Sequence, residues 1–93
     1  MDYRHLGRSG LEVSRLGLGA IPFGTTFDDA ACSSLVDLYA DAGGNWVDTS
    51  NFYGGGMKGS NTQDAGRSER AVGNALKGRR DKFVIATKGC LLY

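Results

Sequence analysis

The chain has 93 residues, of which 41% are hydrophobic and 23% charged, and eleven basic and ten acidic residues leave a formal net charge of +1. This size allows one globular domain with a modest core, and the balanced charge argues against a dedicated nucleic-acid binder, whose surface would be strongly positive. The sequence has no apolar run of about 18 residues for a membrane helix and no signal-peptide region, so we expect a cytoplasmic protein. Its only two cysteines are Cys32 and Cys90, and we expect both to be free thiols.

The first 20 residues predict a β-hairpin followed by a short strand. Two alternating segments within residues 3–16 flank the turn at residues 7–10, Gly-Arg-Ser-Gly, which is a pattern typical of a hairpin. Residues 16–20, Leu-Gly-Leu-Gly-Ala, are short and apolar, as in a buried strand. The 15 glycines against a single proline indicate many tight turns between short elements.

Two helices are predicted downstream of this strand. The first has Thr26 as its N-cap and ends at Gly43 and Gly44. The second begins near Ser68 and has Gly78 as its C-cap. The residues expected to face the core are Ala31, Leu35, Leu38, Tyr39 and Ala42 on the first helix, and Ala71, Val72, Ala75 and Leu76 on the second.

Strands predicted at residues 45–49 and 82–88 complete an alternating order of strands and helices. That order is typical of a parallel sheet connected by right-handed crossovers. We therefore predict an α/β fold that forms one unit, with an N-terminal hairpin, about three parallel strands and two helices.

Polar residues follow two neighbouring strands of this sheet, at the edge where parallel α/β folds bind their ligands. Asp48 ends one strand, Lys88 ends the next, and Tyr53 lies in the loop after Asp48. A tyrosine can act as a general acid when its pKa, about 10 unperturbed, is lowered, and a nearby ammonium lowers it. The three groups can therefore protonate a carbonyl oxygen as hydride reaches the carbon. The alternative is an ordinary ion pair at a strand end, with Tyr53 as a loop aromatic.

Several stretches resemble the aldo-keto reductase family, and together they cover essentially the whole chain. Residues 44–54, Gly-Asn-Trp-Val-Asp-Thr-Ser-Asn-Phe-Tyr-Gly, are similar to the family signature around the second barrel strand. Residues 84–88, Val-Ile-Ala-Thr-Lys, resemble its third strand with the catalytic lysine. Residues 68–73 resemble its second helix, and residues 6–14 and 16–19 resemble its hairpin and first strand.

The resemblance implies the N-terminal part of a (β/α)8 TIM barrel, incomplete here because eight βα units need about 250 residues. Residues 1–93 would be an N-terminal fragment of an aldo-keto reductase domain. The family is an NAD(P)H-dependent oxidoreductase family that reduces aldehyde and ketone carbonyls to alcohols, so the complete enzyme would take a small-molecule carbonyl substrate. Tyr53 is then the general acid and Lys88 and Asp48 tune it. Asp48 also contributes to NADPH or NADH binding, as does Ala20, which stands where the family often carries a threonine.

Two groups of family residues have no counterpart in these 93 residues. The family's fourth catalytic residue is a histidine on the fourth strand, whereas His5, the single histidine, lies in the hairpin that closes the other end of the barrel. The family residues that hold the cofactor phosphates come mainly from later strands and helices. We therefore expect an incomplete cofactor site and an isolated chain that is inactive.

An alternative from another class is a non-catalytic product, either a truncated remnant or a small α/β module that binds a partner through its open sheet edge. The same edge predicts self-association of the chain. One histidine and two cysteines without ligand spacing predict no metal site, and we expect neither nucleic acid nor a membrane as a partner. The stretch at residues 54–66 is interpreted as a surface loop, with a substrate mouth as the alternative.

Overall fold

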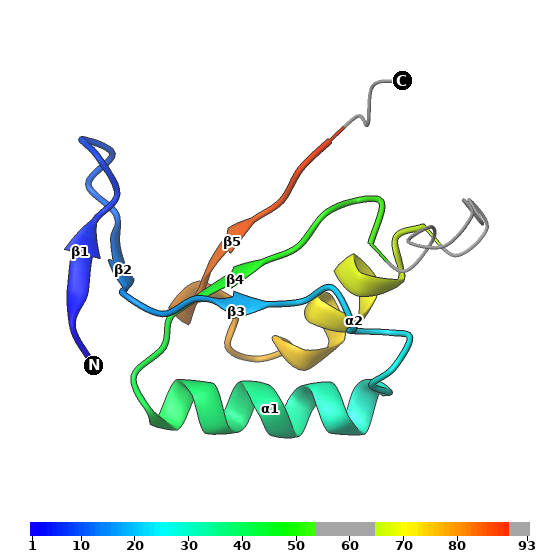
Figure 1. Cartoon of the computed structure of the whole chain (residues 1–93). Helices are drawn as coiled ribbons and strands as arrows, with labels where there is room; N and C mark the ends of the chain where they lie inside the picture. The colour runs from blue at the N-terminus through cyan, green and yellow to red at the C-terminus, as the bar shows by residue number, and fades with distance from the viewer. Residues whose placement is uncertain (54–64, 90–93) are drawn as a thin grey trace.

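The computed structural model describes residues 1–53 and 65–89, which form a hairpin, a small parallel sheet and two α-helices (Figure 1). The antiparallel hairpin pairs β1 (Tyr3–His5) with β2 (Glu12–Ser14). The parallel sheet has the order β3-β4-β5, with β3 (Leu18–Gly19), β4 (Trp46–Asp48) and β5 (Val84–Ala86). The helices are α1 (Asp29–Asp41), α2 (Arg67–Ala75) and the 3-10 helix η2 (Arg80–Lys82). The predicted order of elements is confirmed, and within the described residues the three parallel strands form an open sheet, as expected for part of a barrel.

Both α-helices pack on one face of the sheet, so that in the described residues no helix covers the other face (Figure 1). Successive side chains of a strand point to opposite faces, so Val47, which is 1% exposed, lies in the core while Trp46 and Asp48 are half-buried. Their partners in register, Val84 and Ala86, share that second face. The buried core joins the sheet to both helices and consists of Ala20, Phe23, Cys32, Val36, Val47, Ala71, Val72, Ala75, Leu76 and Phe83.

Helix α1 begins at a different residue from the one predicted. Its N-cap is Asp28, whose Oδ1 accepts a hydrogen bond from the Ala31 backbone N–H at 2.9 Å. The predicted cap, Thr26, lies instead within a turn that the backbone N–H of Gly24 closes on the Phe27 carbonyl at 2.9 Å. The helix therefore starts two residues later than predicted.

The core-facing stripe predicted on α1 is wrong at two of its five positions. Leu38 is 69% exposed and Ala42 is also exposed, whereas Cys32 and Val36 are the buried residues of this helix. The reason is that α1 packs against α2 as well as the sheet, and this turns the Cys32–Val36 line inward. Burial raises the pKa of the free Cys32 thiol.

The inner face of α2 follows the prediction, whereas the ends of α2 and of the last strand do not. The four residues expected on the inner face of α2, Ala71, Val72, Ala75 and Leu76, are all buried. The helix ends earlier than predicted, with Leu76 as its C-cap, and Gly78 lies two residues beyond with a left-handed φ of 81°. The last strand is also shorter than predicted, because Lys82 belongs to η2.

The hairpin is fixed to the N-terminal end of β4. The Asn45 side chain accepts from the Ser14 N–H at 2.7 Å and donates to the Glu12 carbonyl at 2.8 Å, and Trp46 Nε1 donates to the Ser14 carbonyl at 2.8 Å. The Trp46 ring packs so closely on Gly17 that a Cβ there would lie 2.3 Å from it. The hairpin therefore occupies the end of the sheet opposite to the carboxyl ends of the strands.

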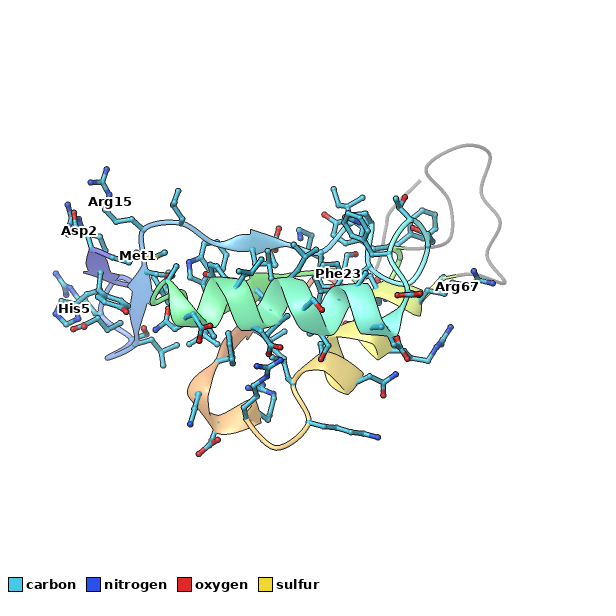
Figure 2. All side chains as sticks on the ribbon, turned by 90° about the horizontal axis from the view of Figure 1, so that it is seen from below. Met1, Asp2, His5, Arg15, Phe23 and Arg67 are labelled. Atoms are coloured by element: carbon cyan, nitrogen blue, oxygen red, sulfur yellow. The ribbon has the colours of Figure 1, made fainter. Side chains whose placement is uncertain are left out.

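His5 lies in this hairpin and is exposed, far from the end of the molecule that carries Phe23 and Arg67 (Figure 2). Residues 54–64 and 90–93, which include most of the predicted surface loop and Cys90, lie outside the described residues. No helix in the described ranges is long and apolar enough to cross a membrane.

Candidate active site

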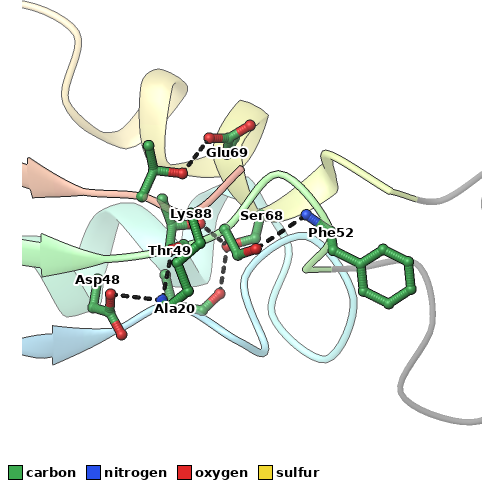
Figure 3. Close-up of polar contacts among 9 residues, drawn as sticks. Ala20, Asp48, Thr49, Phe52, Ser68, Glu69 and Lys88 are labelled. Carbon is green, nitrogen blue, oxygen red and sulfur yellow. Dashed lines mark hydrogen bonds and ion pairs between the residues drawn. The ribbon is translucent and has the colours of Figure 1, made fainter. Parts of the chain in front are cut away.

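Asp48 and Lys88 form an ion pair at the carboxyl edge of the sheet (Figure 3). Strands β4 and β5 run parallel with Asp48 opposite Ala86, and Lys88 follows two residues later on the same face. Its Nζ lies 2.8 Å from Asp48 Oδ1. The side chain of Lys88 is 48% exposed and that of Asp48 is 39% exposed, so a ligand at this edge can reach them.

Lys88 also contacts two groups of the segment that follows β4. Its Nζ donates to the Thr49 carbonyl at 2.9 Å and lies 4.9 Å from the centroid of the Tyr53 ring. An ammonium at that distance from an aromatic face is attracted by the ring. The hydrogen bond to Asp48 raises the pKa of Lys88 above its ordinary value, with a further contribution from Tyr53. Lys88 is therefore a charged ammonium at neutral pH.

Tyr53 is held by its backbone at the end of a short turn. Its N–H donates to the Ser50 carbonyl at 3.2 Å, and its carbonyl accepts from the N–H of Ser68 at 3.3 Å. The Ser50 hydroxyl also accepts from the Phe52 N–H at 3.2 Å (Figure 3). This turn brings the Tyr53 ring back to Lys88, so the structure brings together the three predicted residues.

A set of hydroxyl contacts behind these residues was missed by the sequence analysis (Figure 3). The Thr49 and Ser68 hydroxyl oxygens lie 2.7 Å apart, and the Ser68 hydroxyl donates to the Ala20 carbonyl at 2.6 Å. The Thr87 hydroxyl donates to Glu69 Oε2 at 2.6 Å. The sequence does contain one signal, because Thr49 is next to Asp48 and Thr87 is next to Lys88. It does not show that these threonines pair with residues of α2, because those contacts form only in the folded structure.

Ala20 is placed differently from the other predicted site residues. It is fully buried, its N–H donates to the Asp48 carbonyl at 2.9 Å and its carbonyl accepts from Ser68. Its side chain belongs to the core, so its assignment to the cofactor stays a prediction.

The exposed groups at this edge suit acid–base chemistry better than the binding of phosphates. A carboxylate, an ammonium and a phenol together suit the oxygen of a carbonyl that is being reduced. The same three groups include a single cation, whereas proteins hold a pyrophosphate with several N–H groups and cations. The arrangement of Asp48, Lys88 and Tyr53 therefore suits proton transfer at an oxygen atom better than the binding of a pyrophosphate.

Comparison with curated proteins finds relatives over nearly all of the chain. It is 42% identical over 91 residues to the uncharacterized oxidoreductase YrpG of Bacillus subtilis (strain 168), covering 95% of this chain and 26% of that protein. It is 36% identical over 92 residues to a probable voltage-gated potassium channel subunit beta of Oryza sativa subsp. japonica, covering 95% of this chain and 25% of that protein. The chain thus spans about a quarter of the length of these relatives.

Solved structures match the fold as well. A putative aldo-keto reductase from Pseudomonas aeruginosa has a TM-score of 0.76 and 40% identity, with 94% of this chain and 30% of that chain covered. An aldo-keto reductase from Bacillus halodurans, in its holo form, has a TM-score of 0.78 and 36% identity, with 100% of this chain and 27% of that chain covered. The model of the aldo/keto reductase family matches residues 15–92, a range that contains the whole parallel sheet, both α-helices and the Asp48–Lys88 pair. The chain belongs to the aldo/keto reductase family.

Proposed function

We propose that this chain supplies the acid–base residues of an NAD(P)H-dependent oxidoreductase that reduces aldehyde and ketone carbonyls to alcohols. The observation that carries the proposal is the position of the Lys88 ammonium, which contacts both the Asp48 carboxylate and the Tyr53 ring at an exposed sheet edge. The membership in the aldo/keto reductase family supports it.

In this proposal Tyr53 is the general acid. Its phenol O–H bond breaks as the proton passes to the substrate oxygen, where the negative charge develops. The nicotinamide supplies the hydride to the carbonyl carbon when it is bound. The Lys88 ammonium, 4.9 Å from the ring centroid, stabilises the phenolate that remains. Asp48 holds this ammonium in place through the 2.8 Å ion pair.

The complete enzyme requires more than these residues. The chain spans about a quarter of the length of its curated relatives, and the family takes its catalytic histidine and its phosphate-binding residues from later strands. We therefore propose that residues 1–93 act as the N-terminal part of a barrel, and that the later part adds the histidine and the remainder of the cofactor site.

A chimeric enzyme tests the proposal. In this protein, called the completed barrel below, the chain replaces the segment of Bacillus subtilis YrpG to which it aligns. We expect it to oxidise NADPH or NADH only when an aldehyde or ketone is added, tested over a panel of such compounds on which YrpG is assayed in parallel. YrpG is the positive control, and the same mixture without the carbonyl gives the background. A completed barrel with a folded circular dichroism spectrum that shows no carbonyl-dependent oxidation would contradict the proposal.

The isolated chain is expected to bind NADPH only weakly. The three proposed residues supply one cation, Lys88, which is already paired with Asp48, whereas proteins hold a pyrophosphate with several donors. A titration that follows the fluorescence of the cofactor should show no saturation at micromolar NADPH for the isolated chain, whereas the completed barrel should saturate. A micromolar or tighter dissociation constant for the isolated chain would show that its cofactor site is complete.

A second candidate function is binding of a partner through the uncovered face of the sheet. In the described residues both α-helices lie on one face, and parallel sheets are normally covered on both. β5 also pairs on one side alone in this part of the chain. One relative is named as a probable channel subunit, so it is named for its assembly with other proteins. In this second candidate function the chain would likewise act by binding a partner.

The uncovered face and the unpaired edge of β5 predict that the isolated chain self-associates or packs loosely, because an unpaired strand edge is a template for pairing. Size-exclusion chromatography should give an oligomeric or broad profile that sharpens in the completed barrel. A sharp monomer peak with well-dispersed amide NMR signals from the isolated chain would be evidence against this expectation.

A further inference from the structure

We propose that the first turn of α2 is a positioning element for the site, in which Ser68 and Glu69 hold the residues next to Asp48 and Lys88. This inference rests on the proposed function, because it assigns a role relative to the proposed catalytic residues. Ser68 contacts Thr49 and Glu69 contacts Thr87, so each acts on the site through a neighbour of a proposed catalytic residue.

Ser68 links α2 to the ends of two strands through a directed chain of hydroxyls. A serine hydroxyl has one hydrogen, and that of Ser68 is donated to the Ala20 carbonyl at 2.6 Å. The hydrogen bond of 2.7 Å between Thr49 and Ser68 must therefore be donated by Thr49. Ser68 and Ala20 are fully buried and Thr49 is 1% exposed, so water cannot replace these contacts. The Thr49 position is consequently fixed by Ser68.

Thr49 connects these hydroxyl hydrogen bonds to the proposed catalytic groups. Its carbonyl is the second oxygen that accepts from Lys88 Nζ, at 2.9 Å, beside Asp48 Oδ1. Since Thr49 also follows Asp48 directly, a shift of its backbone would move both acceptors of the ammonium. Lys88 is half-exposed, and a long exposed side chain adopts many rotamers unless its acceptors are fixed.

Glu69 makes a second contact, with the residue that follows β5, and this contact is exposed to solvent, unlike those of Ser68. Its Oε2 accepts from the Thr87 hydroxyl at 2.6 Å, and Thr87 directly precedes Lys88. The N–H of Ser68 in turn donates to the Tyr53 carbonyl at 3.3 Å. Two consecutive residues of one helical turn thus contact the segments that carry all three proposed catalytic groups.

Two variants of the completed barrel test this role. Thr49→Val keeps the shape of the side chain but removes the hydroxyl, and Ser68→Ala removes its partner. We expect kcat to fall about tenfold in each, below the roughly hundredfold loss that a 1 Å misplacement causes, while the KM for the carbonyl stays near its original value. Thr49→Ser, which keeps the hydroxyl, should recover most of the kcat. Ser34→Ala, on an exposed position of α1, is the matched control and should change neither parameter.

A double-mutant cycle separates positioning from general destabilisation. If Ser68 acts through Lys88, the effect of Ser68→Ala on kcat should vanish in a Lys88→Met background. An equal loss in both backgrounds, or an unchanged kcat in the single variants Ser68→Ala and Thr49→Val, would overturn the inference. If Lys88→Met itself keeps full turnover, the proposed function fails, and the positioning role with it. A failure of the positioning role alone leaves the Lys88→Met loss in place.

Discussion

Replacing Tyr53 by phenylalanine in the completed barrel should lower the rate of carbonyl reduction by roughly 10²-fold or more, the range that a positioned proton donor contributes. Phenylalanine keeps the ring that lies 4.9 Å from Lys88 Nζ but has no O–H bond to break. Cofactor affinity should barely change, because the phenol protonates the developing alkoxide and does not hold the dinucleotide. Steady-state turnover and a cofactor fluorescence titration measure the two quantities separately.

Tyr3→Phe is the matched control for this variant. The Tyr3 hydroxyl donates to the Gly43 carbonyl at 2.5 Å in the hairpin region, at the opposite end of the sheet. We expect its loss to leave turnover unchanged. If Tyr53→Phe turned over nearly as fast as Tyr3→Phe, Tyr53 would be an aromatic loop residue and the proton donor would have to be sought elsewhere.

Lys88→Met should be about as damaging as Tyr53→Phe. The substitution preserves much of the side-chain length but removes the ammonium that stabilises the phenolate. It also leaves the Asp48 carboxylate without its ion-pair partner at 2.8 Å and the Thr49 carbonyl without its donor. The measurement is kcat in the completed barrel, at a pH where the raised pKa of Lys88 keeps the lysine charged in the unmodified protein.

Lys82→Met serves as the control for charge removal, because Lys82 is exposed in η2, before β5 begins. Turnover should be unaffected there. A loss in Lys88→Met no larger than that in Lys82→Met would show that the ion pair with Asp48 is only a structural contact at a strand end.

The element order and the meeting of Asp48 with Lys88 could be predicted because both depend on local patterns and on one topological rule. Short apolar segments between turns and helices predicted the strands, and parallel strands place their carboxyl ends at the same edge. Once Asp48 ends β4 and Lys88 follows β5, the register brings their side chains together. Tyr53 follows because its loop leaves the same edge.

Other features depend on tertiary contacts that no local pattern contains. Thr26 and Asp28 are both good N-caps, and the turn between Gly24 and Phe27 decides between them. The period of α1 predicts one apolar stripe, but the packing of α2 selects which residues face inward, so that Cys32 is buried and Leu38 exposed.

The polar contacts between α2 and the strand ends also could not be predicted from local sequence patterns. Ser68 could be predicted at the start of α2, but its hydrogen bonds to Thr49 and Ala20 join positions that are 19 and 48 residues away in the sequence. Tyr39 was predicted as a core residue for its ring, yet its hydroxyl also donates to the Leu16 carbonyl at 2.7 Å. Such contacts become visible only when the fold is known.

The order of two variants tests the central claim most directly, that Tyr53 donates the proton and Asp48 only holds Lys88. Turnover of Tyr53→Phe and Asp48→Asn should be measured side by side in the completed barrel. We predict the larger loss for Tyr53→Phe, because the amide introduced by Asp48→Asn would still offer an oxygen to Lys88 and leave its charge intact, whereas no other group replaces the phenol. Near-full turnover in Tyr53→Phe together with abolished turnover in Asp48→Asn would contradict the claim.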